Sequence, residues 1–454
     1  MRKSCISKIF RGNNMTQTQF NFFQQWYPLS ILADIDPNRP KSVTVLGIRL
    51  VIWKPKQQQH YQVFLDQCPH RLASLSEGRI DEKTGNLMCS YHGWEFDAQG
   101  ICSRIPQAEN PELVKDKFCV QVFPTREEQD LLWFWADPLS SELAAQTPLP
   151  LSPQLDSEKG FIWTSYAREL EYDWQTLVEN VLDPSHVPIA HHGLQGRREN
   201  ARSIPLEIVH STLNLIEAKT PIHIHKIIFQ PPCYIDYEIV FPSGKKFGIV
   251  VYCIPTLPGK SRLIALFPQN FAKTLVKITP RWWEHIMLRN LVIDSDMVLL
   301  HHQERFLQEK QIKETWKTAY KMPTGADRLI IEFRKWFDRY CDGQLPWQQL
   351  NIPVPDYFPF NDNRKQLLDI YHQHTQNCSS CSNALNNIKK LQLGLLIYFI
   401  LTVSGVALMS DRIRLQWGVP LIAIAIFGLG IYGVLKYYLE PKFYFVDYIH
   451  ADKK

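Results

Sequence analysis

Hydrophobic and polar residues alternate over short stretches in the first third of the chain, and turn-forming residues separate these stretches. Residues 43–53 are rich in β-branched and aromatic side chains, which predicts strand and turn. Shorter stretches of the same kind cover residues 61–65, 94–97, 120–123 and 131–135. Turn-forming residues at 81–86 and at Gln99-Gly100 lie between them. The pattern predicts a small antiparallel β domain over residues 20–137.

Helical spacing enters the pattern after residues 137–160, a stretch rich in Pro, Ser and Leu that predicts a linker. Helical stretches begin near Asp173 and at Arg281. Alternation of apolar and polar positions predicts strands at residues 222–229 and 247–254. These elements predict a second folded region, with helices and strands, over residues 160–345.

Two long apolar stretches follow a predicted C-terminal tail over residues 346–390. Leu391–Ser410 contains twenty uncharged residues, and as a helix it would be about 30 Å long, enough to cross a bilayer core. Asp411–Arg414 separates it from a second uncharged stretch, Leu415–Leu435. The pattern predicts a transmembrane helical hairpin over residues 391–439. The alternative is a buried helical hairpin in a soluble core.

Basic residues flank this hairpin on the side of the preceding domains. They are Lys389, Lys390, Lys436 and Lys442. The positive-inside rule therefore predicts that the preceding domains lie on the cytoplasmic or stromal side of the membrane.

Composition adds limits on function. The length of 454 residues predicts two to three domains. The composition, with 21% charged and 45% hydrophobic residues, excludes a disordered or purely membrane-embedded chain. The net charge of +5 is spread along the chain without a dense basic block, so we expect no nucleic-acid partner. Ten cysteines in so long a chain do not make a disulfide framework, which favours a reducing compartment.

The N-terminal residues 1–19 are expected to be an extension. Met1–Ala33 has basic but no acidic residues, and it contains no apolar run of signal-peptide length. A short plastid-like transit segment is one interpretation. A true start at Met15 is the other, and it is the one we favour.

The first chemical motif consists of two short loops, Cys68-Pro-His70 and Cys89-x-x-His92, with eighteen residues between them. Two thiolates and two imidazoles can hold a [2Fe–2S] cluster, with the cysteines on one iron and the histidines on the other. The same four residues could hold one Zn²⁺. Zinc sites favour like ligands in pairs, whereas each loop here mixes one Cys with one His, so the pattern favours the cluster.

A second constellation follows the helical stretch near Asp173. Asp183, His186 and His191 have the spacing Asp-x-x-His-x₄-His. Two histidines and a carboxylate form the facial triad of non-haem Fe(II) oxygenases. His186 and His191 are the expected histidine ligands, and the carboxylate ligand is expected from elsewhere in the chain. Asp296, on the helical stretch after Arg281, is the expected third ligand. The weaker alternatives for this site are Asp294 and His192, and metal binding is not expected of His223, His225, His301 or His302.

A third motif, Cys378-x-x-Cys381, precedes the apolar hairpin. Such a pair is typical of a redox couple or of half a zinc site. His372 and His374 are close enough in sequence to complete a local metal site. We expect a redox pair, with a metal site and no role as the alternatives.

These motifs resemble those of Rieske non-haem iron oxygenases, in particular the pheophorbide a oxygenase and chlorophyllide a oxygenase group. Cys-Pro-His-Arg and Cys-x-Tyr-His-Gly-Trp resemble the two Rieske loops. Asn180-x-x-Asp183-Pro-x-His186, the terminal Cys pair and the two apolar spans point to that group. The resemblance implies an α+β fold, with a Rieske domain over 20–137 and an antiparallel-sheet and helix domain for mononuclear iron over 160–345.

The resemblance also implies a mechanism and partners. A Rieske [2Fe–2S] cluster would pass electrons to Fe(II), which would use O₂ to oxygenate a chlorophyll-type tetrapyrrole. The family's head-to-tail homotrimer would let Asp183 bridge His186 and the partner subunit's His92. No flavin or nicotinamide fingerprint is evident, so ferredoxin is the expected electron donor. The expected location is a cyanobacterial or plastid membrane.

Two function classes remain open at this point. The first is an oxygenase, whose substrate is a tetrapyrrole or another apolar ring such as a sterol. The second is a membrane Rieske electron carrier or redox sensor. A carrier needs no Asp183, His186, His191 and Asp296 set, so the iron site distinguishes the two classes.

Overall fold

The computed structural model describes the chain except for residues 1–18, 111–116, 312–314, 356–357 and 454. The expected extension over residues 1–19 therefore lies almost entirely outside the described residues. The chain divides into two compact units. The first contains Met1–Lys277 and Leu299–Phe360, and the second contains Ile278–Val298 and Asn361–Lys454.

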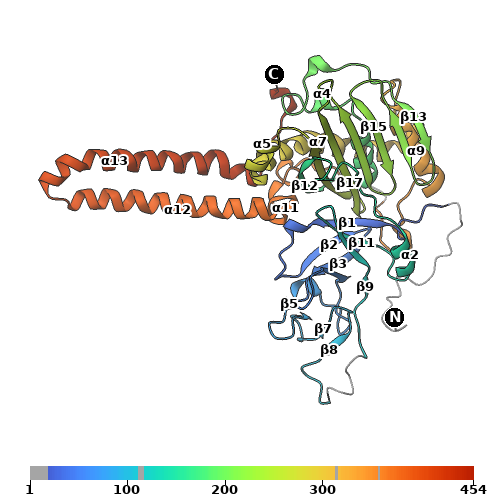
Figure 1. Ribbon diagram of the computed structural model, residues 1–454, viewed down its shortest axis with the longest axis horizontal. Coiled ribbons are helices and arrows are strands. Elements are labelled where there is room, and N and C mark those ends of the chain that lie inside the picture. Colours follow the sequence, from blue (N-terminus) through green and yellow to red (C-terminus); the bar gives the residue numbers. More distant parts are fainter. Residues whose placement is uncertain (1–18, 111–116, 312–314, 356–357, 454) are drawn as a thin grey trace. The chain divides into compact units, whose positions relative to one another are not determined.

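The N-terminal part of the first unit consists of three small antiparallel sheets, as the alternating pattern predicts (Figure 1). Their orders are β1-β11-β10, β2-β3-β4-β9 and β5-β6-β7-β8. The strands are β1 Trp26–Ile31, β2 Lys41–Val45, β3 Ile48–Trp53, β4 Gln62–Leu65, β5 Arg79–Ile80, β6 Leu87–Met88, β7 Glu95–Phe96, β8 Cys102–Arg104, β9 Val122–Phe123, β10 Thr125–Glu128 and β11 Leu131–Trp135. Leu46 and Gly47 make the tight turn between β2 and β3, and both have positive φ, as this kind of hairpin turn requires.

The stretch expected to be a plain linker contains a short helix, α2, over Ser141–Gln146. Ala144 on this helix is buried, and its carbonyl accepts a hydrogen bond from Arg126 at 3.1 Å. Most residues of this helix, Ser-Glu-Leu-Ala-Ala-Gln, are strong helix formers, so the local signal was present. The Pro- and Ser-rich residues around it led to the linker prediction instead.

A seven-stranded antiparallel sheet forms the rest of the first unit's core, in the order β12-β18-β17-β16-β15-β14-β13 (Figure 1). Its strands are β12 Ile162–Leu170, β13 Glu207–Ser211, β14 Ile216–Lys219, β15 Ile224–Gln230, β16 Tyr234–Val240, β17 Lys246–Leu257 and β18 Lys260–Gln269. Helices α3 (Trp174–Leu182) and α9 (Arg328–Cys341) meet through their aromatic side chains. The Trp174 ring centroid lies 5.7 Å from that of Phe333 and 5.5 Å from that of Phe337.

The second unit is helical. A π-helical turn, His285–Arg289, follows α6 (Arg281–Glu284) and continues into α7, Asn290–Gln311, of which the residues from Leu299 onward belong to the first unit. After α10 (Arg364–Leu367) and α11 (Ile370–Gln373), the chain forms α12, Ser379–Leu408, and α13, Asp411–Val434.

Helices α12 and α13 run antiparallel as a hairpin (Figure 1). By length and composition both could cross a membrane. Their apolar side chains are mostly exposed, including Leu401, Leu408, Leu415 and Phe427. Such exposure does not fit the alternative of a hairpin buried in a soluble core.

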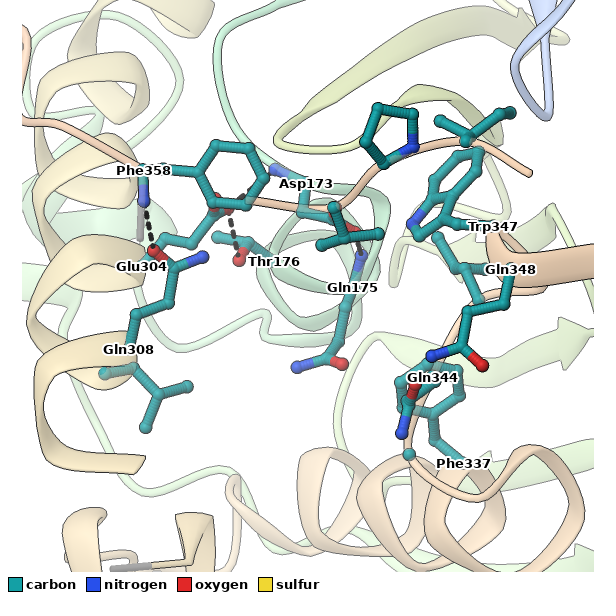
Figure 2. A pocket seen from close by; sticks show the side chains of 16 residues that line it. Asp173, Gln175, Thr176, Glu304, Gln308, Phe337, Gln344, Trp347, Gln348 and Phe358 are labelled. Atoms are coloured by element: carbon teal, nitrogen blue, oxygen red, sulfur yellow. Dashed lines mark hydrogen bonds between the residues drawn. The ribbon is translucent and has the colours of Figure 1, made fainter. Parts of the chain in front are cut away.

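Two carboxylates fix the start of α3, one partly buried and one buried. The Asp173 carboxylate caps the helix by accepting from the Gln175 N–H at 3.3 Å. The Glu304 carboxylate accepts from the Asp173 N–H at 2.6 Å and from the Thr176 hydroxyl at 3.0 Å (Figure 2). It also pairs with Arg305 at 2.8 Å. These groups border a cavity of about 480 Å³. Burial and the neighbouring Asp173 raise the pKa of Glu304 to about 7, against the opposite effect of Arg305.

We therefore expect the free energy of unfolding to depend on pH through Glu304. Its usual pKa is 4.5, so between that pH and about 7 the folded state keeps a proton that the unfolded chain has released. Stability should fall as pH rises through this window, by about 3 kcal/mol. Glu304→Gln should remove this contribution, which thermal unfolding of both proteins across the window would measure.

The control for this experiment is Glu142→Gln, which changes an exposed carboxylate on α2. It should keep the pH dependence of the unmodified protein. An unchanged dependence in Glu304→Gln would contradict the assignment.

Candidate functional site

The two cysteine loops have the same backbone hydrogen-bond pattern. In each loop, the cysteine N–H donates to the carbonyl five residues later, and the cysteine carbonyl accepts from the N–H four residues later, all at 2.9 Å. The residue four positions after the cysteine has positive φ in both cases, with Leu72 at 62° and Gly93 at 71°. Cys68 and Cys89 are thus held in equivalent turns, one after β4 and one between β6 and β7.

The two histidines of these loops lie together. The ring centroids of His70 and His92 are 4.4 Å apart, and His70 stacks on Trp94 with an interplanar angle of 5°. The buried Nδ1 of His70 has no hydrogen-bond partner among the described residues, as expected of a ring nitrogen that serves as a metal ligand. Burial lowers the pKa of His70, which favours the neutral imidazole that binds metals.

The two cysteines are buried and free of disulfides. Burial raises the pKa of the Cys68 thiol to about 12. A bare thiolate is therefore unfavourable there, and a metal must stabilise it. Two buried thiols beside two neutral imidazoles fit the donor set of a Rieske cluster.

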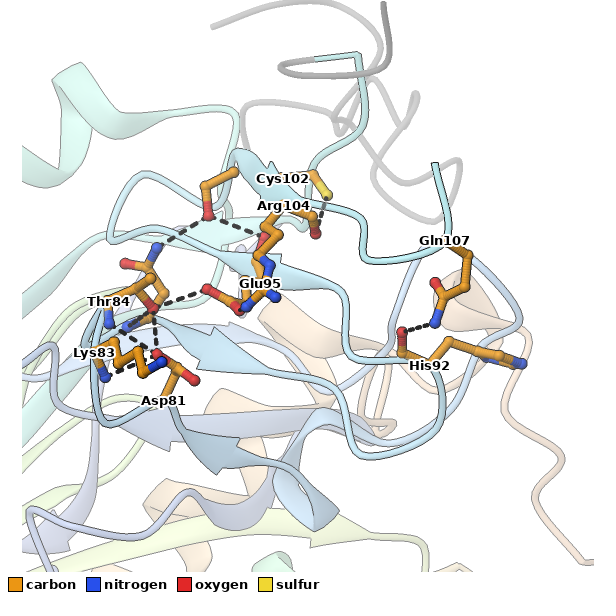
Figure 3. A network of polar contacts seen from close by, with 10 residues as sticks. Asp81, Lys83, Thr84, His92, Glu95, Cys102, Arg104 and Gln107 are labelled. Carbon is orange, nitrogen blue, oxygen red and sulfur yellow. Dashed lines mark hydrogen bonds and ion pairs between the residues drawn. The ribbon is translucent and has the colours of Figure 1, made fainter. Parts of the chain in front are cut away.

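A polar network supports the second loop (Figure 3). The carboxylate of Glu95, on β7, is fully buried; it pairs with Arg104 at 2.8 Å and accepts from the Thr84 hydroxyl at 2.8 Å. Gln107 donates to the His92 carbonyl at 2.8 Å. Sequence reasoning missed Glu95, although its position within the Trp-Glu-Phe strand was the available signal.

The second site lies beyond the C-terminal end of α3. His186 precedes α4 (Val187–Ala190) and His191 follows it, and their Nε2 atoms are 3.2 Å apart. Asp296, on α7, completes the group: one ligand atom from each residue lies within 4.8 Å of the others. Nitrogens bound to one ion at about 2.1 Å are typically separated by about this distance, so the two histidines fit one metal.

Asp183 lies beside this group, as the motif predicts. One carboxylate oxygen accepts from the Ser185 N–H at 2.7 Å and from its hydroxyl at 2.5 Å. The other oxygen is 4.0 Å from the Nδ1 of His186. The ring nitrogen of His186 that faces away from His191 is therefore the one that faces Asp183.

The other candidates lie outside this metal-ligand group, which contains neither His192 nor Asp294. The Nδ1 of His192 accepts from the Arg198 N–H at 3.1 Å, and the buried Asp294 lies on α7 two residues before Asp296. His223 and His225, for which no metal binding was expected, are exposed.

The terminal Cys pair lies at the start of α12. Cys378 is the residue before the helix and Cys381 lies in its first turn. Both thiols are buried and free. The redox role expected for this pair stays a prediction.

Two family models match parts of the chain. Residues 25–124 match the Rieske [2Fe–2S] domain, and residues 229–314 match pheophorbide a oxygenase. The chain is 36% identical to chloroplastic pheophorbide a oxygenase of Oryza sativa subsp. japonica over 96% of this chain and 86% of the relative. It is 34% identical to chloroplastic flavonoid 8-hydroxylase 2 of Ocimum basilicum, over 96% and 87%.

The fold is similar to that of dicamba monooxygenase bound to dicamba, with a TM-score of 0.57 at 19% identity over 71% of this chain and 98% of that one. Fold and sites together define a Rieske non-haem iron oxygenase, with a [2Fe–2S] site and a His/His/Asp site for mononuclear iron. Within that class, the chain belongs to the family that contains pheophorbide a oxygenase and chlorophyllide a oxygenase.

Because the two metal sites use separate residues, a substitution in one site should remove the metal from that site and leave the other metal in place. Cys89→Ala should abolish the Rieske-type spin-resonance signal of the reduced protein and leave mononuclear iron in place. His186→Ala should keep that signal and lose the mononuclear iron and all oxygenation. Spin resonance and iron analysis of the two variants, each the control for the other, measure both effects.

Stoichiometric zinc without iron in the unmodified protein would contradict the cluster. Full turnover by His186→Ala would contradict the position of the mononuclear site.

Proposed function

We propose that the protein is a membrane-anchored Rieske oxygenase that inserts O₂-derived oxygen into a large apolar ring, a chlorophyll-type tetrapyrrole. The observation that carries this proposal is that a Rieske loop pair and a His/His/Asp group occur in one chain, whose similarity to pheophorbide a oxygenase extends over 96% of its length. A Rieske electron carrier needs only the cluster, so it would not require the His/His/Asp group.

In this proposal each metal has a defined set of ligands. The cluster ligands are Cys68, His70, Cys89 and His92, and the iron ligands are His186, His191 and Asp296. When bound, the cluster supplies single electrons and the iron supplies O₂ activation. Asp183 is proposed to orient the His186 ring and to make its imidazole a stronger ligand, in the manner of the carboxylates that commonly accompany metal-bound histidines.

Exposed hydrophobic side chains beside the cluster loops support docking onto another protein surface. Leu72 is 66% exposed and Tyr91 is 62% exposed, next to His70 and His92 in sequence. Two large apolar side chains at a loop tip are typical of an interface. We assign this surface to a neighbouring subunit of a head-to-tail homotrimer, a heterologous ring that closes. The partly exposed Asp183 carboxylate would then also accept from the partner subunit's His92.

Electrons are proposed to come from ferredoxin, because the sequence has no flavin or nicotinamide fingerprint. Helices α12 and α13 are proposed to anchor the protein in a plastid or cyanobacterial membrane, with the metal domains on the stromal or cytoplasmic side. Two observations support this: the relatives named above are chloroplastic, and both helices are apolar, exposed and flanked by lysines.

A flavonoid-like ring is the second candidate substrate, because identity to the basil flavonoid 8-hydroxylase, 34%, is close to the 36% found for pheophorbide a oxygenase. A sterol remains the third.

The substrate is tested by incubating purified protein with pheophorbide a, a flavone or a sterol under ¹⁸O₂ with reduced ferredoxin. Labelled product from the tetrapyrrole alone is the expected result. Labelled flavone instead would replace the proposed substrate, and His186→Ala is the control for label that does not depend on the iron site. Oxidation of ferredoxin without any labelled product would contradict the oxygenase proposal.

Excision of the hairpin should release the protein from membranes. A Cβ atom at Gly428 would lie 3.6 Å from the Leu395 side chain, so the two helices are in contact there. Replacing residues 397–427 with a short Gly-Ser linker should therefore preserve the chain that follows α13. We expect carbonate washing to release this variant with its iron, while the full chain stays in the membrane. Membrane retention of the variant would contradict the anchor.

A further inference from the structure

A further group of side chains that could hold a metal ion lies within the second, helical unit and belongs to neither iron site. It consists of His285, His374, Cys378 and Cys381, whose ligand atoms all lie within 4.8 Å of one another. All four side chains are buried, with exposed fractions of 3% or less. Thiolates and imidazoles are soft or borderline ligands, and four of them gathered in a buried interior are suited to a transition-metal ion.

The distances within this group match one tetrahedral ion. The Nε2 of His374 is 3.3 Å from the Cys381 sulfur, and the Nδ1 of His285 is 3.7 Å from the sulfur of Cys378 and 3.5 Å from that of Cys381. Zinc–sulfur bonds of about 2.3 Å and zinc–nitrogen bonds of about 2.0–2.1 Å give tetrahedral edges of about 3.3–3.8 Å. We propose that these four residues form a mononuclear Cys₂His₂ zinc site.

Local structure brings the four ligands together from two segments. Cys378 and Cys381 have the Cys-x₂-Cys spacing common in structural zinc sites, at the start of α12. His374 comes directly after α11, so three ligands come from one short stretch. His285 begins the π-helical turn before α7, and such turns occur frequently at functional sites.

The surroundings favour a structural site. Ile286, Leu385 and Phe443 are buried in the same apolar cluster as the two cysteines, which keeps water from the ligands. Arg281 lies with its Nη2 atom 3.9 Å from the Cys378 sulfur, where its charge stabilises a thiolate. The ion would link the segment before α7 to the base of the α12–α13 hairpin.

The geometry distinguishes this site from two alternatives. A Rieske cluster holds its thiolates and imidazoles on different irons, whereas here both histidines contact cysteine sulfurs directly. A redox disulfide would need only the two cysteines and would leave two buried histidines without a role. The zinc proposal accounts for all four residues.

Zinc K-edge absorption of the full chain, purified in detergent without added metal, tests the proposal directly. The expected result is about one zinc per chain in addition to iron, with two sulfurs at about 2.3 Å and two nitrogens at about 2.0–2.1 Å. This measurement needs no variant and no activity. Iron-replete protein without zinc, or a Cys378–Cys381 disulfide in protein blocked with a thiol reagent before purification, would overturn the proposal.

Variants assign the ligands. Cys381→Ser and His374→Gln should each lose the zinc while the Rieske spin-resonance signal remains. The matched control is His372→Gln on α11, because His372 is exposed and pairs with Asp369 at 2.6 Å outside the group. Zinc that remains bound in both test variants would overturn the assignment.

Discussion

The catalytic part of the protein depends on the close approach of two imidazoles just beyond α3. The Nε2 atoms of His186 and His191 lie 3.2 Å apart, a separation that is favourable only when a shared ion or proton lies between them. The N-terminal end of α3 is fixed by the partly buried Asp173 carboxylate and the buried Glu304 carboxylate. At its C-terminal end, Asp183 leaves the helix and holds the loop that carries both histidines.

Three groups of Cys, His and Asp residues occur in the described part of the chain, and their arrangement rather than their type determines their chemistry. Mixed Cys and His loops with the same backbone turn keep the thiolates equivalent and the imidazoles adjacent, as a two-iron cluster requires. The His/His/Asp group leaves metal positions open for reaction. The proposed Cys₂His₂ group closes all four positions in an apolar interior, as structural zinc requires.

The sequence predicted much of the fold and most of the site residues, because these features have local signatures. Alternation predicted the strands on both sides of the β2–β3 turn. Motif spacing pointed to the two cysteine loops and to His186 and His191, and the structure brings these two histidines together with Asp296. The short helix α2 was missed because Pro- and Ser-rich residues surround its six residues, although most of those six are good helix formers. Spacing did not predict His285 either, because a π-helical turn far from Cys378 in sequence brings it to the terminal cysteines, and only the folded chain shows that contact.

The proposed electron path runs from the cluster of one subunit to the iron of the next through the Asp183 carboxylate. The most direct measurement is a single turnover of Asp183→Asn, in which the cluster is reduced, substrate and O₂ are added, and cluster reoxidation is followed by spin resonance. We expect both metals to remain and reoxidation to slow by about 10- to 100-fold, whereas Glu142→Gln, which changes an exposed carboxylate on α2, should stay close to the unmodified rate. Reoxidation of Asp183→Asn at the normal rate would contradict this path.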